Sequence, residues 1–446
     1  MIRRSFFLSF VTALLACSSD DASSPLVKDD AGADAADTAF PVEHEPACDP
    51  GPTPLAEHSI GPSTRVATLV SKNTPLATAG RDNPSAHDGM TKYLADGMGD
   101  FAKGPGRDGG VVDDLLPGSG ASAGVAGRKS VAYIHHTSDF QLADDESPVR
   151  LIAFDNSIAP GAGRPQEGAL PLAVSAMHRT ITALTKSRPL DFEIVTGDCA
   201  DNSQKNEHEW FLGLMNGQKG LTTDSGDDDD PVLGPGNDVK DPFDAVAAPA
   251  PWYFVFGNHD VEIQGTSNSD EGTVVSALGD EPKNGTRDYR LMYAPITREL
   301  VPADAKRMPV SRAEIIAGLL ADGAAPGPKG HGFTSGALTH YVTEPIPGVP
   351  LRLIQLDTND PDAGSDGQVT QKTLDEFLEP ALVAAEKDGK LVILASHHAT
   401  TNIDPGKGLE STPVPGALTG KQVEDAVAKH PNVILWLVGH NHHNRV

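Results

Sequence analysis

The sequence has few positive charges for its 446 residues. It holds 35 Lys and Arg against 62 Asp and Glu, which gives a net charge of −27 at pH 7. A broad basic face of the kind that binds nucleic acid is therefore not expected. Two segments carry much of the acidic excess. Residues 18–60 hold ten acids and one Lys, and residues 221–245 hold eight acids and one Lys.

Cysteine is also scarce, with only Cys17, Cys48 and Cys199 in the chain. If Cys17 carries a lipid, the other two could pair in an oxidising compartment, but the sequence alone does not establish a disulfide. Cys48 lies in a polar segment, whereas Cys199 lies beside a candidate metal ligand. We expect Cys199 to be a small buried residue.

The apolar run at the N-terminus, residues 6–16, is too short to span a bilayer. Two arginines precede it, which is typical of an export signal. Residues 14–17, Leu-Leu-Ala-Cys, resemble the bacterial lipobox, although a chance cysteine is the alternative. Ser18 follows, which by that resemblance favours the outer membrane. We expect a lipoprotein-type signal peptide over residues 1–17 and attachment to the membrane through lipid on Cys17.

Composition divides the rest of the chain into three parts. Residues 18–60 are rich in Ala, Asp, Ser and Pro, so an acidic disordered tether is expected. Residues 61–130 show no sustained period of 2 or 3.6, and we assign them only as an irregular N-terminal extension. Residues 131–446 form the expected folded domain, with insertions at 213–250 and 261–350.

Strands and helices alternate in the folded part. A short apolar strand begins near residue 131, helical spacing follows over 168–187 until Pro189, and the next strand is at 192–195. This alternation of strand, helix and strand is typical of an α/β fold. Later segments continue the pattern: strands at 252–256, 351–358, 391–395 and 433–438, and helices at 311–321, 374–387 and 422–430.

The stretch WYFVFGNHD, residues 252–260, shows most clearly how these strands end. Its apolar, aromatic part predicts a buried strand that stops at Gly257 and places Asn258, His259 and Asp260 in a turn. Ligands of α/β sheets bind in the crevice beyond the strand ends. A turn that merely contains Asn and Asp is the alternative for this stretch taken alone.

Five strand ends together offer His, Asp and Asn side chains, in the sequences SDFQ, GDCADN, GNHD, SHHAT and GHNHH. Imidazole nitrogens with carboxylate and amide oxygens suit Mn, Fe or Zn in a hydrolytic site better than a structural zinc. The candidate ligands are too many for one open catalytic ion, which favours a pair of divalent or trivalent ions. They are Asp139, Asp198, Asn258, His397, His440 and His442.

The order of these motifs, D-x-[H], G-D-x-x-D, G-N-H-D, H-H and G-H-x-H, resembles the calcineurin-like metallophosphoesterase superfamily over about residues 131–446. The segment LDT at 356–358 resembles a further recurring segment of these enzymes. The resemblance implies a four-layer α/β/β/α sandwich, with two mixed β-sheets flanked by helices and a dinuclear site at the strand ends. The family continues with further strands after the last motif, so we expect an apparently truncated domain.

The resemblance also implies roles for the site residues. His259 would protonate the leaving oxygen or steady the phosphoryl group, and Asp201 would orient His259 by a hydrogen bond. The attacking group would be a metal-bridging hydroxide. The ligands divide into two sets that share one carboxylate: Asp139 and His442 for the first ion, Asp198 as the bridge, and Asn258, His397 and His440 for the second ion.

Some positions depart from the family pattern or leave alternatives. Gln141 stands where the family usually has a metal-binding His; we count it among the ligands, and its amide oxygen is expected to hold the first ion loosely. His398 is an alternative to His397, which aligns better with the family's H-x-P-like segment. His331 could reach a substrate from an insertion, but a structural His in a turn is the default. His443 is expected outside the ligand set.

We therefore expect a metal-dependent phosphohydrolase that cleaves phosphomonoester or phosphodiester bonds. The alternative is a non-catalytic or weakly active metal-binding surface lipoprotein on the same fold, which Gln141 would favour. The presence of both His259 and Asp201 argues against it, because a binding protein has no need of that pair. The two insertions, which would select the phosphate-ester substrate, carry no recognisable motif.

Overall fold

The computed structural model describes residues 67–71, 101–105 and 131–442, except for 155–162, 164–166, 187, 231, 288–295, 337, 362–363 and 406–414. The expected signal peptide with Cys17, the tether with Cys48, and His443 lie outside these residues. All described residues belong to one unit, Ala47–Val446. Within the expected N-terminal extension, β1 (Ala67–Ser71) pairs antiparallel with β2 (Phe101–Pro105).

The first sheet has the order β3-β4-β5, and both of its strand pairs are parallel. Its strands are β3 (Ile134–Thr137), β4 (Phe192–Val195) and β5 (Trp252–Phe254). Helix α3 (Leu170–Leu184) lies between β3 and β4 in the chain, and α4 (Lys205–Asn216) lies between β4 and β5. All four residues of β4 are buried, as expected for a parallel strand that is covered on both faces.

The second sheet is mixed and has the order β11-β10-β9-β8. Strands β9, β10 and β11 are parallel, whereas β8 is antiparallel to β9. Because parallel strands have their carboxyl ends at one edge, the polar residues that follow β10 and β11 share that edge. The strands are β8 (Tyr341–Thr343), β9 (Leu351–Gln355), β10 (Leu391–Ala395) and β11 (Val433–Leu437).

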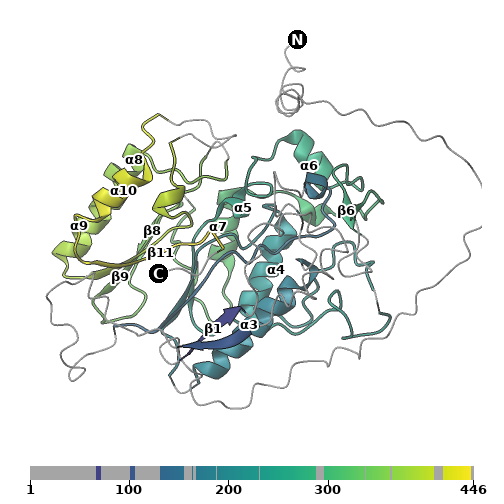
Figure 1. The fold of residues 1–446 in the computed structure, drawn as a ribbon, viewed down its shortest axis with the longest axis horizontal. Helices are drawn as coiled ribbons and strands as arrows, with labels where there is room; N and C mark the ends of the chain where they lie inside the picture. The colour runs from purple at the N-terminus through teal and green to yellow at the C-terminus, as the bar shows by residue number, and fades with distance from the viewer. Residues whose placement is uncertain are drawn as a thin grey trace, which may run out of the picture. The chain divides into compact units, whose positions relative to one another are not determined.

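Alternate residues of the second sheet enter two different cores. Leu353 and Ile393 pack in the cluster that also contains the buried residues of β4 and β5, whereas Ile354 and Val392 pack in a cluster with α9 (Glu379–Lys387) and α10 (Gly420–Val427). Figure 1 shows α9 and α10 along one side of this sheet. The period of two residues in a strand produces this arrangement. The expected α/β sandwich is confirmed.

Several further elements surround the sheets. The predicted helix at 311–321 is α7 (Arg312–Ala321), and Ser311 caps it by accepting the N–H of Glu314. The helix predicted at 374–387 starts three residues earlier in the structure, with α8 (Gln371–Thr373), and continues through a π-helical turn, Leu374–Leu378, into α9. No described helix is long and apolar enough to cross a membrane. Other short elements are α5 (Asn258–Val261), α6 (Glu271–Ala277), β6 (Thr286–Arg287), β7 (Ile296–Thr297) and the 3₁₀ helices Ile152–Phe154, Glu167–Ala169, Ala305–Arg307 and Thr400–Asn402.

Candidate metal centre

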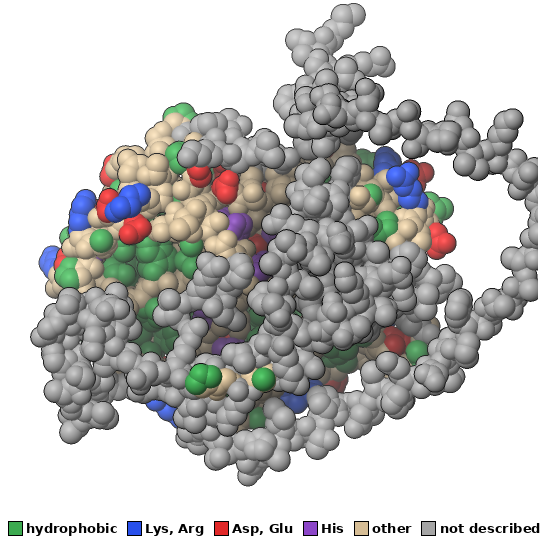
Figure 2. All heavy atoms as spheres, in the orientation of Figure 1, with side chains coloured by type: hydrophobic (Ala, Val, Ile, Leu, Met, Phe, Trp, Pro, Cys, Tyr) green, Lys and Arg blue, Asp and Glu red, His purple; other side chains and the backbone are tan. Residues whose placement is uncertain are grey.

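The strand ends of the two sheets meet at one place. His397, which follows β10, has its Nδ1 2.7 Å from the carbonyl oxygen of Thr196, just after β4. The backbone N–H of His440, which follows β11, donates to Oδ1 of Asp139 at 3.0 Å, beyond β3. On the face drawn in Figure 2, histidine side chains reach the surface in the middle of the described region. Side chains that are far apart in the sequence are therefore brought together.

Asp198 lies at the centre of these groups and is almost fully buried. Its Oδ2 is 3.2 Å from Nε2 of His397, and its Oδ1 accepts the backbone N–H of His259 at 2.9 Å. Burial acts against its charge, but the neighbouring imidazoles of His397 and His259 outweigh burial and hold the pKa of Asp198 well below its usual value. The carboxylate is therefore negatively charged at neutral pH.

Asp139 joins Asp198 on one side of the centre. The ligand atoms of Asp139, Asp198 and His397 all lie within 4.8 Å of one another. Nε2 of His442 is 3.3 Å from Oδ1 of Asp139. The structure thus places His442 beside the carboxylate with which it was predicted to share an ion.

Asn258 and His440 lie on the other side. Oδ1 of Asn258 is 3.3 Å from Nδ1 of His440, while Nδ2 of Asn258 donates to the carbonyl oxygen of Gly265 at 2.9 Å. That second bond orients the amide, because it leaves the acceptor oxygen facing His440. His440 also forms a group of potential ligand atoms with His397 and His398.

His397 and His398 are both fully buried, and each is held through Nδ1. Nδ1 of His397 contacts the Thr196 carbonyl, and Nδ1 of His398 is 2.9 Å from Oγ1 of Thr358 in the LDT segment. Nε2 of His397 faces Oδ2 of Asp198 at 3.2 Å, and among the described residues Nε2 of neither ring makes a hydrogen bond of regular geometry. Buried imidazole nitrogens that are held at Nδ1 and keep Nε2 available in this way suit metal ligands. His397 is the one that contacts Asp198; His398 stays an alternative.

His259 and Asp201 form a pair next to these groups. Nδ1 of His259 lies 3.1 Å from Oδ1 and 3.0 Å from the carbonyl oxygen of Asp201. Burial opposes protonation of the ring, but the carboxylates of Asp198 and Asp201 outweigh it and raise the pKa of His259 to about 10. Arg150, buried and paired with Glu167 at 2.6 Å, reaches within 3.8 Å of Oδ2 of Asp201.

Gln141 lies beside His259 and is buried. Its Nε2 is 3.3 Å from Nε2 of His259, and its backbone N–H donates to the carbonyl oxygen of Asp198 at 2.8 Å. Since Nδ1 of His259 contacts Asp201, Nε2 is the ring nitrogen that can exchange a proton with a substrate, and it lies on the side that faces Gln141. The structure therefore places Gln141 next to His259 as well as at the end of β3.

Five of the predicted ligands have left-handed backbone conformations, which are uncommon for residues other than glycine. Such conformations cost about 1–3 kcal/mol each and persist only where the surrounding structure enforces them, most often at functional sites. Here they occur in the loops that follow β3, β4 and β11. The φ angles are 57° for Asp139, 44° for Gln141, 54° for Asp198, 71° for His440 and 50° for His442.

Two motif glycines allow the loops after β4 and β5 to touch. A Cβ on Gly257 would lie 2.1 Å from Oδ1 of Asp198, and a Cβ on Gly197 would lie 2.4 Å from the backbone nitrogen of Gly257. Gly197 also has a φ of 90°. No side chain fits at either position, so the G-D and G-N-H-D motifs need their glycines for close backbone contact.

Asp260 connects the same two loops through contacts that the sequence did not reveal. Its carboxylate accepts four backbone N–H groups, and burial, reinforced by the charge of Asp198, raises its pKa to about 7. The side chain is fully buried. It therefore positions the ligand loops rather than binding an ion. The four bonds are from Asp198 at 2.9 Å, Cys199 at 2.8 Å, Ala200 at 3.0 Å and Gly257 at 2.8 Å.

His331 and Cys199 are buried inside the fold. His331 is fully buried, stacks on Trp252 with ring centroids 3.4 Å apart, and pairs with Asp322 at 2.9 Å. The ring is thus held inside the fold, which agrees with the default expectation of a structural His. Cys199 is a free, buried thiol, as expected. A further cluster of potential metal ligands consists of three acidic residues, Glu146, Asp224 and Asp229. In this cluster Glu146 pairs with Arg307, and Asp229 lies 3.7 Å from Nζ of Lys240.

Comparison with known proteins agrees with this geometry. The family model described as calcineurin-like phosphoesterase matches residues 133–444, which is more than half of the chain. A search of the curated proteins finds no match. The matched range contains both sheets and every predicted ligand, and the resemblance seen in the motifs is thereby confirmed. The chain belongs to the calcineurin-like phosphoesterase family.

Proposed function

We propose that this chain hydrolyses phosphomonoesters or phosphodiesters with two metal ions, which are Mn, Fe or Zn. The observation that carries the proposal is the position of Asp198, whose carboxylate lies between the side chains of the two sheets and next to His259. Membership of the family supports a metal-dependent phosphoester hydrolase in general. The particular ligands and the role of His259 are our inference from the geometry.

The donor set fits such ions. It combines carboxylate and amide oxygens with imidazole nitrogens and contains no thiolate, as in hydrolytic rather than structural metal sites. The buried Nε2 atoms of His397 and His398, which make no regular hydrogen bond within the described residues, fit it as well. Asp139, His442 and Gln141 would hold one ion, Asp198 would be shared, and Asn258, His397 and His440 would hold the other.

When bound, the ions would make water available as a nucleophile at neutral pH and neutralise the charge of the phosphoryl group. The chain itself supplies the proton. Nδ1–H of His259 donates to Asp201, so the ring is fixed in one orientation with Nε2 turned away from Asp201. The Asp201 carboxylate stabilises the protonated ring, and Nε2–H can then pass its proton to the leaving oxygen.

We also propose that the enzyme is exported and attached to the bacterial cell envelope, at the outer membrane, through lipid on Cys17. The support is the charge, length and small residues of the segment before Cys17. The acidic stretch 18–60 would then separate the catalytic domain from the membrane surface. The strong negative charge argues against a broad nucleic-acid-binding surface.

The test is hydrolysis of bis(p-nitrophenyl) phosphate and of p-nitrophenyl phosphate with added Mn. The wild type should turn over at least one of them, and His259→Ala should lower the rate by about 10²- to 10⁴-fold, the usual contribution of a general acid. His430→Ala, which removes a histidine that contacts Glu379 and Glu386 in α9, is the control and should retain activity.

Two results would count against the proposal. Lack of metal-dependent turnover with both substrates would favour the alternative, a metal-binding lipoprotein that is inactive or weakly active. Full activity in His259→Ala, with Mn still bound, would leave a hydrolase but remove the proposed proton donor.

A further inference from the structure

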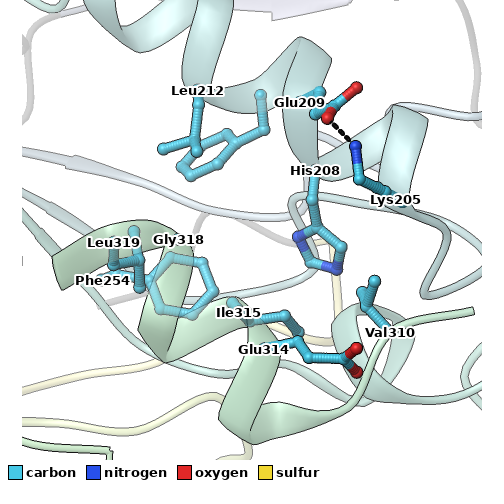
Figure 3. Close-up of a pocket in the computed structure, with 11 residues that line it drawn as sticks. Lys205, His208, Glu209, Leu212, Phe254, Val310, Glu314, Ile315, Gly318 and Leu319 are labelled. Atoms are coloured by element: carbon cyan, nitrogen blue, oxygen red, sulfur yellow. Dashed lines mark hydrogen bonds and ion pairs between the residues drawn. The ribbon is translucent and has the colours of Figure 1, made fainter. Parts of the chain in front are cut away.

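A largely apolar pocket lies between helices α4 and α7 and reaches strand β5 (Figure 3). Its volume is about 350 Å³. A space of this size and character suits a small molecule. None of the predicted metal ligands lines it. Its apolar walls consist of Phe211, Leu212, Phe254, Val310, Ile315 and Leu319.

Gly318 helps to keep this pocket open. It lies inside α7 at a position that lines the pocket, and a Cβ built on it would have no heavy atom within 4 Å. Glycine within a helix is less stable than alanine. Because no described segment outside α7 approaches the position of this Cβ within 4 Å, packing against those residues does not require the glycine. Its missing side chain leaves space in the wall.

His208 supplies one hydrogen-bond acceptor to the pocket. Its Nε2 lies 2.9 Å from the carbonyl oxygen of Asp260, which can only accept, so Nε2 carries the hydrogen. Burial lowers the pKa of His208 to about 4, so the ring is neutral and Nδ1 has a free lone pair. No group of the described residues donates to this Nδ1. In Figure 3 the ring extends from α4 toward Ile315.

The charged groups around the pocket are already paired within the chain. Lys205 forms an ion pair with Glu209 one turn along α4. Glu314 accepts the backbone N–H of Ser311 at 2.8 Å and its hydroxyl at 2.7 Å in the capping box of α7. Among the described residues that line the pocket, Lys205 is therefore the one cation, set against the two carboxylates Glu209 and Glu314. This charge balance disfavours an anion and favours an uncharged ligand.

We propose that this pocket binds an uncharged, mainly apolar small molecule with one hydroxyl group, whose O–H donates to Nδ1 of His208. The apolar body would pack against Phe211, Phe254 and Leu319 in the space left by Gly318. This site is additional to the metal centre. It adjoins that centre through the bond from His208 to Asp260, the residue that holds the ligand loops.

Calorimetric titration of the full chain with three naphthalene derivatives tests the chemistry. 2-Naphthol should bind saturably. 2-Methoxynaphthalene has the same apolar body without a donor and should bind roughly fivefold to tenfold more weakly, the effect of one neutral hydrogen bond. The anion 2-naphthoate should not bind. Absence of saturable 2-naphthol binding, or equal affinity for all three compounds, would overturn the proposal.

Variants test the location without reference to phosphoesterase activity. Gly318→Leu should fill the pocket and abolish 2-naphthol binding, and Leu212→Trp should do the same from the α4 wall if the first variant does not fold. Ala317→Leu is the matched control, since Ala317 is the exposed neighbour in α7 and does not line the pocket; it should bind like the wild type. Wild-type affinity in the two filling variants would place 2-naphthol elsewhere and refute the site.

Discussion

Asp260 accepts the backbone N–H of Asp198 at 2.9 Å, and the same carboxylate accepts the N–H of Gly257 at 2.8 Å. One buried side chain thus fixes the two loops that carry the shared carboxylate and the ligand amide. Asp260→Asn would replace one acceptor oxygen with a donor that faces backbone N–H groups. We expect a loss of about 2–4 kcal/mol in the free energy of unfolding, measured by urea denaturation. Weaker Mn binding should accompany it.

The control for Asp260→Asn is Asp280→Asn, at an exposed position. Its stability should stay within about 0.5 kcal/mol of the wild type, as for most surface substitutions. If Asp260→Asn were as stable as this control and bound Mn equally well, Asp260 would not position the loops.

Gln141→His should bind the first ion more tightly. An imidazole is a better ligand for a transition metal than an amide oxygen, and Gln141 follows Asp139 by two residues at the end of β3. We expect an increase of roughly tenfold in Mn affinity, comparable with the smaller effects of changes around metal sites. Competition with a chelator measures it. Gln141→Ala, which offers no ligand, should bind no more tightly than the wild type; equal affinity in all three proteins would place position 141 outside the metal centre.

His208 should make the fold sensitive to mild acid. Its pKa is lowered to about 4 in the folded chain, chiefly by burial, against 6.5 when unfolded. Between these values the unfolded chain binds more protons, so this contribution to stability is complete above pH 6.5 and is lost as the pH falls toward 4. The loss is on the order of 3 kcal/mol. Urea midpoints of the wild type and His208→Gln should agree in pH dependence above pH 6.5 and diverge below it; parallel curves down to pH 4 would refute this.

Cys17→Ser should release the protein from the membrane. Without the thiol no lipid can be attached, so palmitate labelling should vanish and the protein should move to the soluble fraction of a bacterial host. Cys48→Ser, in the expected tether, is the matched control and should remain labelled. Membrane attachment of Cys17→Ser to the same extent as the wild type would show that another feature anchors the chain.

The sequence predicted the framework of the fold well, because long apolar runs between polar turns are local features. The strand at 391–395 coincides with β10, and the helix at 311–321 differs from α7 by one residue. Strand β8 and helix α4 were not predicted. Strand β8 has only three residues, which is too short for a clear pattern. The polar residues of α4 obscure its periodicity, although Glu207 lies three residues after the N-cap Gln204 and closes a capping box.

The site was predictable as a set of residue types at strand ends, but not as a network of contacts. Nothing local shows that Asp260 accepts four N–H groups or that Arg150 approaches Asp201, since these partners are far apart in the chain. The left-handed conformation of Asp139 was equally hidden. Such conformations depend on the tertiary structure that enforces them, and residues other than glycine give no local signal for them.

The most direct test of the two-ion account is the metal content of the wild type and of Asp198→Ala. Both proteins are loaded with Mn, desalted and analysed by mass spectrometry of the metal, with folding checked by circular dichroism. The account predicts about two Mn per wild-type chain, and fewer than one in Asp198→Ala together with loss of bis(p-nitrophenyl) phosphate hydrolysis, because Asp198 is the proposed shared ligand. Equal metal content and equal turnover in the two proteins would contradict it.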